Sequence, residues 1–558
     1  MNISRFLLLF LLAFMMLNSA QAKENIGVSN TPKPASGKTE AADCNASTAQ
    51  VDLNVNNVRA RLLTGGDLWW DPVGANPHYE VPRVPPGSEQ QSVHSIFAGA
   101  LWIGGIDQLG QLKVSAQTYR QSGNDFWPGP LDGNGQVDQE TCNRFDRFWQ
   151  VRGSDIDNYL AALELAGGTL SPGQVPEAIL QWPGKNNPFF TSFNLPPNKD
   201  LAPFIDNDDD GVYDPTKGDY PVIDPTCGGV YADQMIWWIF NDRGNIHTET
   251  GGEAIGLEVN AIAFAFATND EVNNMTFYKY IVENKSTQPV DSVFFGQWVD
   301  PDLGLYTDDF VGCVPSEGLG IVYNGDAVDE GFYGASPPML GVDFFRGPKK
   351  LVAIDADGNA VYEELGMTSF LYYDNNFTVR GNPENASHFY GYLAGVWKDG
   401  RPFTFGGNGY GGTTPYPYMF DGDPTDNSAW SECSANNTPF DRRFLQSSGP
   451  FQLTPGAVND VIVGVVWVRD GLQYPCPTFA PLVRADKKAQ ALFDNCFKLQ
   501  DGPDAPSIYI RELDQELIIT LWNDTLISNN AYESYAEPDL ILANQGFPEI
   551  GRASCRER

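Results

Sequence analysis

Between residues 51 and 500 the chain consists of short runs of apolar and aromatic residues separated by turn-forming residues. The sequence holds 56 Gly and 40 Pro, which interrupt helices and favour turns. Such runs are typical of β-strands joined by tight turns, so we predict an all-β fold. Because roughly 450 residues exceed what one core usually holds, we expect one large β-sandwich with insertions or two packed β-sandwich domains, divided near residues 200–230.

Four segments carry the clearest strand pattern, because each is rich in β-branched or aromatic residues and ends in turn formers. They span residues 258–268, 275–283, 292–299 and 458–468. Several are apolar on both faces, which suits the interior of a sandwich. Apolar residues at helical spacing also predict two helices that cover the sheets, over residues 154–166 and 481–499.

The N-terminal 22 residues have the order of a secretory signal peptide: Arg5, then an apolar run over residues 6–17, then Ala20-Gln21-Ala22. Residues 23–50 hold almost no large apolar side chain, which predicts a flexible leader. No later segment approaches the roughly 20 continuous apolar residues of a membrane span. We therefore expect an exported protein without a membrane span.

The C-terminal part begins near Asp501, where the sequence DGPDAP predicts a linker. Residues 507–522 predict two strands, which we interpret as the start of an immunoglobulin-like or fibronectin-like domain over residues 501–550. We expect this domain to be truncated, because too few residues follow to complete a sandwich. The ending GRASCRER is basic and unlike the rest, so we interpret residues 551–558 as a non-native tail.

The formal net charge is -36, from 71 acidic and 35 basic residues. A surface of this charge repels phosphate backbones, so we exclude nucleic acid as a partner. Cations are the natural partners of such a chain, although solubility outside the cell explains many exposed acids equally well.

The eight cysteines contain no CxxC pair and no zinc-site spacing. Export permits disulfides, but pairing cannot be read from sequence. We weigh two pairs: Cys476 with Cys496, which are neighbours in the chain, and Cys227 with Cys313, which bracket the densest strand region.

The strongest functional motif is DNDDDGVYD, which begins at Asp206 and places carboxylates at positions 1, 3, 5 and 9 and a glycine at position 6. Calcium takes six to eight oxygen ligands, so a short loop must turn sharply at the glycine while alternate side chains point inward. The expected ligands are the side chains of Asp206, Asp208, Asp210 and Asp214 and the carbonyl of Val212.

Position 12 of this loop is Lys217, where a calcium hand of the helix-loop-helix type carries a bidentate glutamate. The last ligand must therefore come from elsewhere, and Asp219 and Asp224 are the two alternatives. In this respect the loop resembles thrombospondin type 3 and dockerin loops more than a calcium hand.

A second acidic group, Asp300 and Asp302 followed by Asp308 and Asp309, has a less diagnostic spacing. We regard these four residues as a second possible metal site, against the alternative of acidic turns.

The sequence provides little evidence for a catalytic site. The four histidines form no HExxH pair, and a GxSxG nucleophile elbow is missing from the sequence. Dense aromatic pairs such as Trp69-Trp70 and Trp237-Trp238 are best explained as core, although part of the aromatic set would suit stacking on sugar rings. An enzyme is therefore the less favoured interpretation.

Several stretches together resemble the large secreted proteins of Bacteroidetes that use the type IX secretion system and carry a C-terminal sorting domain. They include NNVRARLLTGGDLWWD, IFAGALWIGGIDQLGQLKVSAQTYRQSGNDFWPGPL, DNDDDGVYDPTKGDYP, WVDPDLGLYTDDFVGC and DRRFLQSSGPFQLTPGAVNDVIVG. The resemblance implies export across the outer membrane, surface display or release, and a β-rich ectodomain. It does not imply an enzyme, and the sorting domain itself is missing from this sequence.

Together these features predict a calcium-stabilised β-sandwich protein, secreted or displayed on the outer-membrane surface, with a non-enzymatic binding or scaffold role. The alternatives are a carbohydrate-binding or carbohydrate-active protein, and an adhesin for surface attachment. The expected partners are Ca²⁺ and, in the alternatives, glycans or cell-surface components.

Overall fold

The computed structural model of the protein describes residues 43–85, 87–88, 91–120, 123–355, 358–498, 507–513 and 516–522. The predicted signal peptide, the leader up to residue 42 and the interpreted tail at 551–558 lie outside the described residues.

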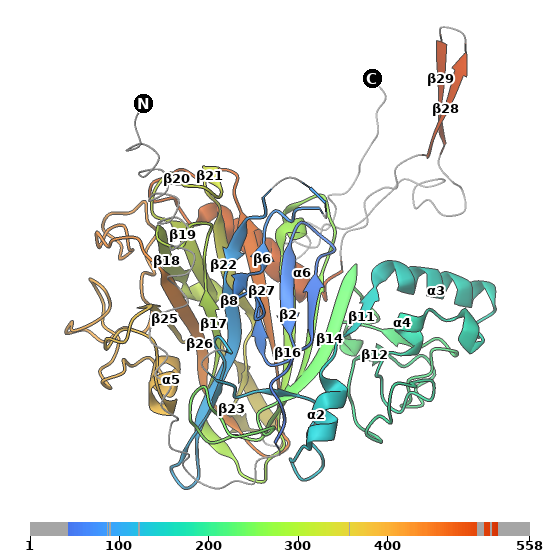
Figure 1. Ribbon diagram of the computed structural model, residues 1–558, viewed down its shortest axis with the longest axis horizontal. Helices are drawn as coiled ribbons and strands as arrows, with labels where there is room; N and C mark the ends of the chain where they lie inside the picture. The colour runs from blue at the N-terminus through green and yellow to red at the C-terminus, as the bar shows by residue number, and fades with distance from the viewer. Residues whose placement is uncertain are drawn as a thin grey trace, which may run out of the picture.

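Two large antiparallel sheets form the body of the described chain (Figure 1). Sheet 1 has the strand order β25 (Ser369–Asp374), β26 (Arg442–Leu453), β17 (Val290–Asp300), β8 (Ala98–Asp107), β3 (Asp67–Leu68), β2 (Arg59–Leu63), β6 (Tyr79–Glu80) and β7 (His94–Ile96), with β1 (Gln50–Leu53) on β2 and β9 (Leu112–Ala116) on β8. Sheet 2 has the order β10 (Trp127–Pro128), β14 (Gln234–Asn241), β15 (Leu257–Ala265), β16 (Thr276–Asn284), β27 (Val458–Val468), β22 (Met339–Arg346), β19 (Leu319–Asn324) and β18 (Asp309–Val314), with β11 (Trp149–Arg152) on β14.

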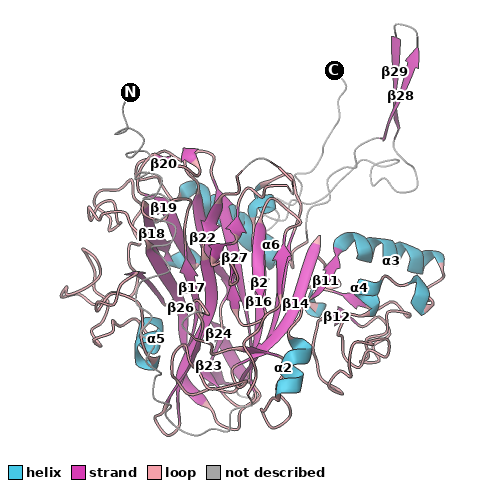
Figure 2. Ribbon diagram, viewed as in Figure 1, coloured by secondary structure: helices cyan, strands magenta, loops and turns pink. Residues whose placement is uncertain are grey.

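Shorter elements connect and cover these sheets (Figure 2). The strand pairs are β4 (Trp70–Asp71) with β5 (Asn76–Pro77), β12 (Phe204–Ile205) with β13 (Tyr220–Pro221), β20 (Val328–Asp329) with β21 (Gly334–Ala335), β23 (Lys349–Ile354) with β24 (Ala360–Glu364), and β28 (Ser507–Leu513) with β29 (Glu516–Trp522). The α-helices are α2 (Gln139–Phe145), α3 (Gly153–Leu165), α4 (Glu177–Leu180), α5 (Ala386–Leu393) and α6 (Ala480–Asp494). The 3-10 helices are η1 (Pro172–Gln174), η2 (Pro225–Cys227), η3 (Glu271–Asn274) and η4 (Pro315–Glu317).

The main core lies between the two sheets and confirms the predicted all-β sandwich. On β14, Trp238 packs into this core while its neighbour Trp237 packs on the opposite face of the sheet, because successive side chains of a strand alternate. Buried polar groups are paired across the core: the Trp69 indole on the sheet 1 side donates to the Tyr278 hydroxyl of β16 over 2.8 Å. Both faces of sheet 2 are thus apolar, as predicted for interior strands.

The outer face of sheet 2 carries a second hydrophobic cluster. Helix α6 covers part of it through Leu482, Ala485 and Ala489. Residues 153–233, which we call the lobe, contribute to the same cluster and lie beside β11 and β14 (Figure 1). The main core takes side chains from Leu53 to Trp467, on both sides of the division considered near residues 200–230, and the lobe adds side chains to the outer cluster.

The structure contains the helices and strands predicted from the sequence, and their ends differ from the predicted ends by a few residues. The four predicted strands are β15, β16, β17 and β27, and the helix predicted over 154–166 is α3. The helix predicted to reach residue 499 ends at Asp494, because Cys496 enters a disulfide and Phe497 turns back into the outer cluster, both with positive φ. The two strands predicted within 507–522 form the hairpin β28–β29.

Three disulfides join distant parts of the described chain, and both pairs weighed from the sequence are wrong. The bonds are Cys44–Cys142, Cys227–Cys496 and Cys433–Cys476. Cys313 is instead a buried thiol on β18 whose Sγ donates to the Met419 carbonyl over 3.4 Å. The Cys227–Cys496 bond ties the lobe to the end of α6, a contact between segments separated by 269 positions.

The predicted leader is also shorter than expected at its C-terminal end. Cys44 is buried and bonded to Cys142 of α2, and its backbone N–H donates to the Gly244 carbonyl over 2.9 Å. Residues from 43 onward therefore belong to the folded body. Among the described residues, no helix combines the length and the apolar character needed to cross a membrane.

Candidate functional site

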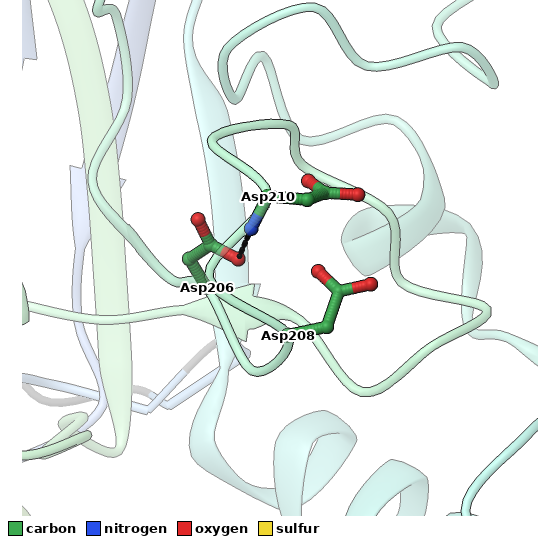
Figure 3. A group of neighbouring side chains, drawn as sticks. All are labelled: Asp206, Asp208 and Asp210. Carbon is green, nitrogen blue, oxygen red and sulfur yellow. Dashed lines mark hydrogen bonds between the residues drawn. The ribbon is translucent and has the colours of Figure 1, made fainter.

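The Asp206 loop is the tip of a hairpin in the lobe, between β12 and β13. Carboxylate oxygens of Asp206, Asp208 and Asp210 all lie within 4.8 Å of one another (Figure 3). Asp206 is half-buried, and the other two are exposed. The structure therefore brings together three of the predicted ligands at the surface of the lobe.

The loop turns as its sequence predicts. Asp206 accepts hydrogen bonds from the N–H groups of Asp210, at 3.2 Å, and Gly211, at 2.7 Å (Figure 3 shows the first). Gly211 has a φ of +76°, a conformation that glycine adopts at little cost. The Val212 N–H donates to Asp210 Oδ1 over 2.8 Å, so Val212 lies within the same turn.

Two buried tyrosines fix the base of the loop. The Tyr159 hydroxyl of α3 donates to the carbonyls of Pro215, at 2.8 Å, and Asp219, at 3.1 Å. Tyr213, within the loop, donates to the carbonyl of Ile179 in α4 over 2.7 Å. These hydrogen bonds fix the C-terminal half of the loop to the helices of the lobe.

Asp219 lies against the loop, whereas Asp224 does not. Asp219 is buried, and its two oxygens accept the N–H groups of Asn207, at 2.8 Å, and Asp214, at 2.7 Å. Burial, together with the Asp206 and Asp208 carboxylates, raises the pKa of Asp219 to about 6. Asp224 instead caps η2 and pairs with Lys279. Of the two alternatives for a further ligand, Asp219 therefore lies next to the loop and Asp224 lies away from it.

Lys217 and Asp214 complete the charge distribution of the loop. The Lys217 ammonium lies 3.2 Å from Asp208, 3.1 Å from Asp210 and 3.7 Å from Asp214. These carboxylates, led by Asp210 and Asp208, raise the pKa of Lys217. Asp214 also accepts from the Thr216 N–H over 3.0 Å. Lys217 therefore lies next to three carboxylates whose negative charge would also attract a divalent cation.

The second predicted cluster falls into separate groups of carboxylates. Asp300 and Asp302 group with Asp441, and all three are buried. Arg443 donates to Asp441 over 2.7 Å and lies 3.4 Å from Asp300, and the Tyr119 hydroxyl also donates to Asp300. The guanidinium supplies a positive charge at this group, which makes it an internal ion-pair network.

Asp308 and Asp309 point to different surroundings. Asp308 groups with Asp326 and Glu330. Asp309 is fully buried, and its Oδ2 accepts from the Leu303 N–H over 3.0 Å. Asp300 and Asp302 thus belong to a different group of carboxylates from Asp308, and the second metal site expected from Asp300, Asp302, Asp308 and Asp309 stays a prediction.

The sequence analysis missed a buried ion pair on β26. The Arg442 guanidinium donates to both oxygens of Glu432, at 3.1 and 2.9 Å, and to Asp374 at 2.9 Å. Burial raises the pKa of Glu432, although Arg442 opposes the shift. The only sequence signal was two arginines at the start of a long apolar strand, which implies buried partners without naming them.

The aromatic side chains are mostly core. Every tryptophan whose side chain the structure describes is less than 9% exposed, including Trp69, Trp70, Trp237 and Trp238. The tryptophans thus provide no exposed platform for sugar stacking among the described residues. No protein-family model and no curated protein matches this chain.

Proposed function

We propose that this protein is a non-enzymatic, calcium-stabilised β-sandwich that binds or scaffolds other molecules at the cell exterior, secreted or displayed on the outer-membrane surface. The observation that carries the proposal is the Asp206 loop, in which three carboxylates converge around a glycine turn. Oxygen-only ligands on a short loop suit Ca²⁺, which tolerates irregular geometry, better than Mg²⁺, which demands an octahedron.

The residues available to hold calcium are the carboxylates of Asp206, Asp208, Asp210 and Asp214 and the carbonyl of Val212. A cation there would join the two ends of the loop and so fix the lobe tip. Folded loops bind the ion and unfolded ones do not, so at calcium 100 times above Kd the folded state gains about 2.7 kcal/mol. Extracellular calcium modules bind at roughly 10⁻⁴ to 10⁻³ M, which suits a protein outside the cell.

Three observations support the exterior location. The described chain carries three disulfides, which persist in oxidising compartments. The N-terminal sequence has the pattern of a signal peptide, and the net charge of -36 favours solubility. The resemblance to exported type IX proteins agrees with these three observations.

Isothermal titration of the purified chain with CaCl₂, and separately with MgCl₂, tests the metal site. We expect a calcium-specific binding heat, and we expect the Asp208→Asn/Asp210→Asn double variant to bind one calcium fewer per chain. The matched control is Glu140→Gln/Asp494→Asn, which removes two exposed carboxylates elsewhere. An unchanged calcium stoichiometry in the loop variant would refute the assignment.

A second candidate function, carbohydrate binding, is favoured by one surface hollow of about 370 Å³. Its lining includes the Phe440 ring, which is 52% exposed, beside Asp374, Asn375 and Asn376. An aromatic face next to polar side chains can stack on a pyranose and hold its hydroxyls. Retention on a glycan panel that Phe440→Ala abolishes would support this function, and release of reducing ends would separate hydrolysis from binding.

A further inference from the structure

The loop between β14 and β15, residues 242–256, carries a histidine that the fold buries. The His247 side chain is 1% exposed. Its Nδ1 lies 2.9 Å from the carbonyl oxygen of Val114 on β9, and its Nε2 lies 2.7 Å from the carbonyl oxygen of Asp242. Each ring nitrogen therefore contacts a hydrogen-bond acceptor.

Only the imidazolium form of His247 satisfies both contacts. A carbonyl oxygen accepts hydrogen bonds and donates none, and a neutral imidazole carries a single N–H group. In the neutral ring one nitrogen would turn its lone pair toward a carbonyl oxygen and would stay buried without a hydrogen bond, which costs free energy. The geometry thus requires protons on both ring nitrogens.

A buried carboxylate supplies the counter-charge. Asp125 is fully buried, and its Oδ2 lies 3.6 Å from Nδ1 of His247. Both of its oxygens accept hydrogen bonds, Oδ1 from the Glu249 N–H over 3.0 Å and Oδ2 from the Thr250 hydroxyl over 2.6 Å. This pattern of acceptors suits the ionised form of Asp125, so the two side chains form a buried ion pair.

Asp242 provides a second negative charge beside the ring. Its carboxylate accepts from the N–H groups of Ile255 and Leu257, both at 2.7 Å, and so holds the end of the loop. Burial lowers the pKa of His247, but the charges of Asp125 and Asp242 outweigh it and raise that pKa above the ordinary value. The charges around the ring therefore act in the same direction as its hydrogen bonds.

The other charged side chains of the loop are Arg243, Glu249 and Glu253. Glu249 accepts a hydrogen bond from a threonine hydroxyl. On β9, which packs against the ring, Lys113 lies 3.8 Å from Asp107. Asp125 and Asp242 are thus the acids that act on the protonation of the ring.

The contacts of His247 join the two sheets. Val114 belongs to β9 of sheet 1, whereas the loop connects two strands of sheet 2. The Val114 N–H also donates to the Glu253 carbonyl over 3.1 Å, and the Thr248 N–H donates to the Asn124 carbonyl over 3.0 Å. The protonated ring therefore holds the loop against sheet 1.

We propose that His247 is a pH-sensitive clasp, whose imidazolium form closes the loop over residues 242–256 onto β9 and Asp125 and whose deprotonation opens the loop as pH rises. Loss of a ring proton removes one of the two hydrogen bonds and leaves the Asp125 carboxylate buried without its counter-charge, which is costly. The clasp shares no residue with the Asp206 loop, so it does not depend on the proposed calcium site.

Imidazole ¹⁵N spectra of the full chain test the protonation state directly. At about pH 7.5, roughly one unit above the ordinary histidine pKa of 6.5, we expect a ring with protons on both nitrogens. The signal of this ring should be missing from the His247→Gln variant. The proposal is overturned if the unchanged chain has no doubly protonated ring, or if the variant keeps every such signal.

Thermal unfolding between about pH 7 and pH 9 tests the pH dependence. The pKa of His247 is higher in the folded state than in the unfolded state, so its stabilising contribution is full below about pH 6.5 and is lost as pH rises through the folded-state pKa. We expect Tm to fall more steeply in the unchanged chain than in His247→Gln. Equal slopes in the two proteins would overturn the proposal.

His388→Gln on α5 is the matched control for the slope. Burial, and then Lys398, lower the pKa of His388, so its ring is neutral across this pH range and the variant should keep the slope of the unchanged chain. Hydrogen exchange at about pH 7 locates the opening. Peptides from residues 242–256 should exchange faster in His247→Gln, and peptides from β27 should not. Unchanged exchange in residues 242–256 would also contradict the clasp.

Discussion

The ammonium of Lys217 lies 3.1 Å from Oδ2 of Asp210, inside the loop that we propose binds calcium. The lysine stands at position 12, where calcium hands carry a glutamate. It therefore acts as an internal counter-ion that a metal ion must displace.

Replacing this lysine should strengthen calcium binding. Lys217→Gln removes the competing charge but keeps a side chain of similar length, so we expect the calcium affinity to rise about tenfold. Calorimetric titration measures the change. The control is Lys488→Gln on α6, which removes an equal charge from the ion pair of Lys488 with Asp270 and should leave the calcium affinity unchanged. A lower affinity in the Lys217 variant would mean that the lysine supports the loop.

Asp219 should control the pH dependence of calcium binding. Its pKa is raised to about 6 by burial and by the Asp206 and Asp208 carboxylates. Without calcium, this raised pKa stabilises the fold at low pH, and the contribution is lost as pH rises from about 4 to about 6. Calcium needs the ionised form, so its affinity should fall as pH is lowered through about 6. Titrations on both sides of that pH measure the effect.

Substitution distinguishes the two alternatives for the further ligand. In Asp219→Asn an amide oxygen can serve only one of the two loop N–H groups that the carboxylate now accepts, so the loop loosens and calcium binding weakens. Asp224→Asn should have no effect on calcium binding, because Asp224 pairs with Lys279 outside the loop. The reverse order of effects would contradict the assigned geometry.

The buried pair of Arg442 and Glu432 should dominate the stability of its corner of sheet 1. Arg442→Met leaves the Glu432 carboxylate buried without its partner, so we expect a loss of about 3–5 kcal/mol in the free energy of unfolding. Chemical denaturation measures it. Breaking the exposed pair Arg144–Glu140 by Arg144→Met should cost at most about 0.5 kcal/mol. Similar losses in both variants would show that burial does not set the energy of the pair.

Asp343 of β22 and Asp486 of α6 should make stability fall with rising pH. Both are buried, and Oδ1 of Asp486 has no hydrogen-bond partner among the described residues. Burial, then the neighbouring Glu317, raises the pKa of Asp486 from 3.8 to about 8, against the opposing charge of Lys487. The pKa of Asp486 is higher in the folded state than in the unfolded state. Its contribution to the free energy of unfolding is therefore full below pH 4 and is lost as pH rises to about 8.

Asp486→Asn should flatten this pH dependence, with a difference of at least about 1.4 kcal/mol across the window. Free energies of unfolding at several pH values measure the slope. Asp494→Asn, an exposed residue on the same helix, should keep the slope of the unchanged protein. An unaltered slope in the Asp486 variant would show that the carboxyl group is already ionised in the folded state.

The strands and the first site could be predicted because their information is local. β16 and β27 are long β-branched and aromatic runs ended by turn formers, so their ends were placed within one residue. The Asp206 loop carries its carboxylates and its turn within nine consecutive residues. No contact with a distant segment is needed to recognise it.

The remaining features depend on contacts between distant segments. Cys227 meets Cys496 only because the lobe packs near the end of α6, and chain distance favoured other pairs. Asp302 meets Asp441 because β17 and β26 are neighbours in sheet 1. Asp343 meets Asp486 across the packing of a helix on a strand. The spacing of residues along the sequence does not show which distant segments pack together. It therefore could not show that Asp302 groups with Asp441.

The central claim is that calcium stabilises the fold through the Asp206 loop, and thermal unfolding tests it most directly. The full chain and the Asp208→Asn/Asp210→Asn variant would be melted in millimolar CaCl₂, in MgCl₂ and in excess EDTA. We predict that CaCl₂ raises Tm and that MgCl₂ and EDTA do not. We also predict that CaCl₂ raises the Tm of the variant less than the Tm of the unchanged chain. An equal Tm in all three solutions, or the full calcium-dependent rise in the variant, would contradict the account.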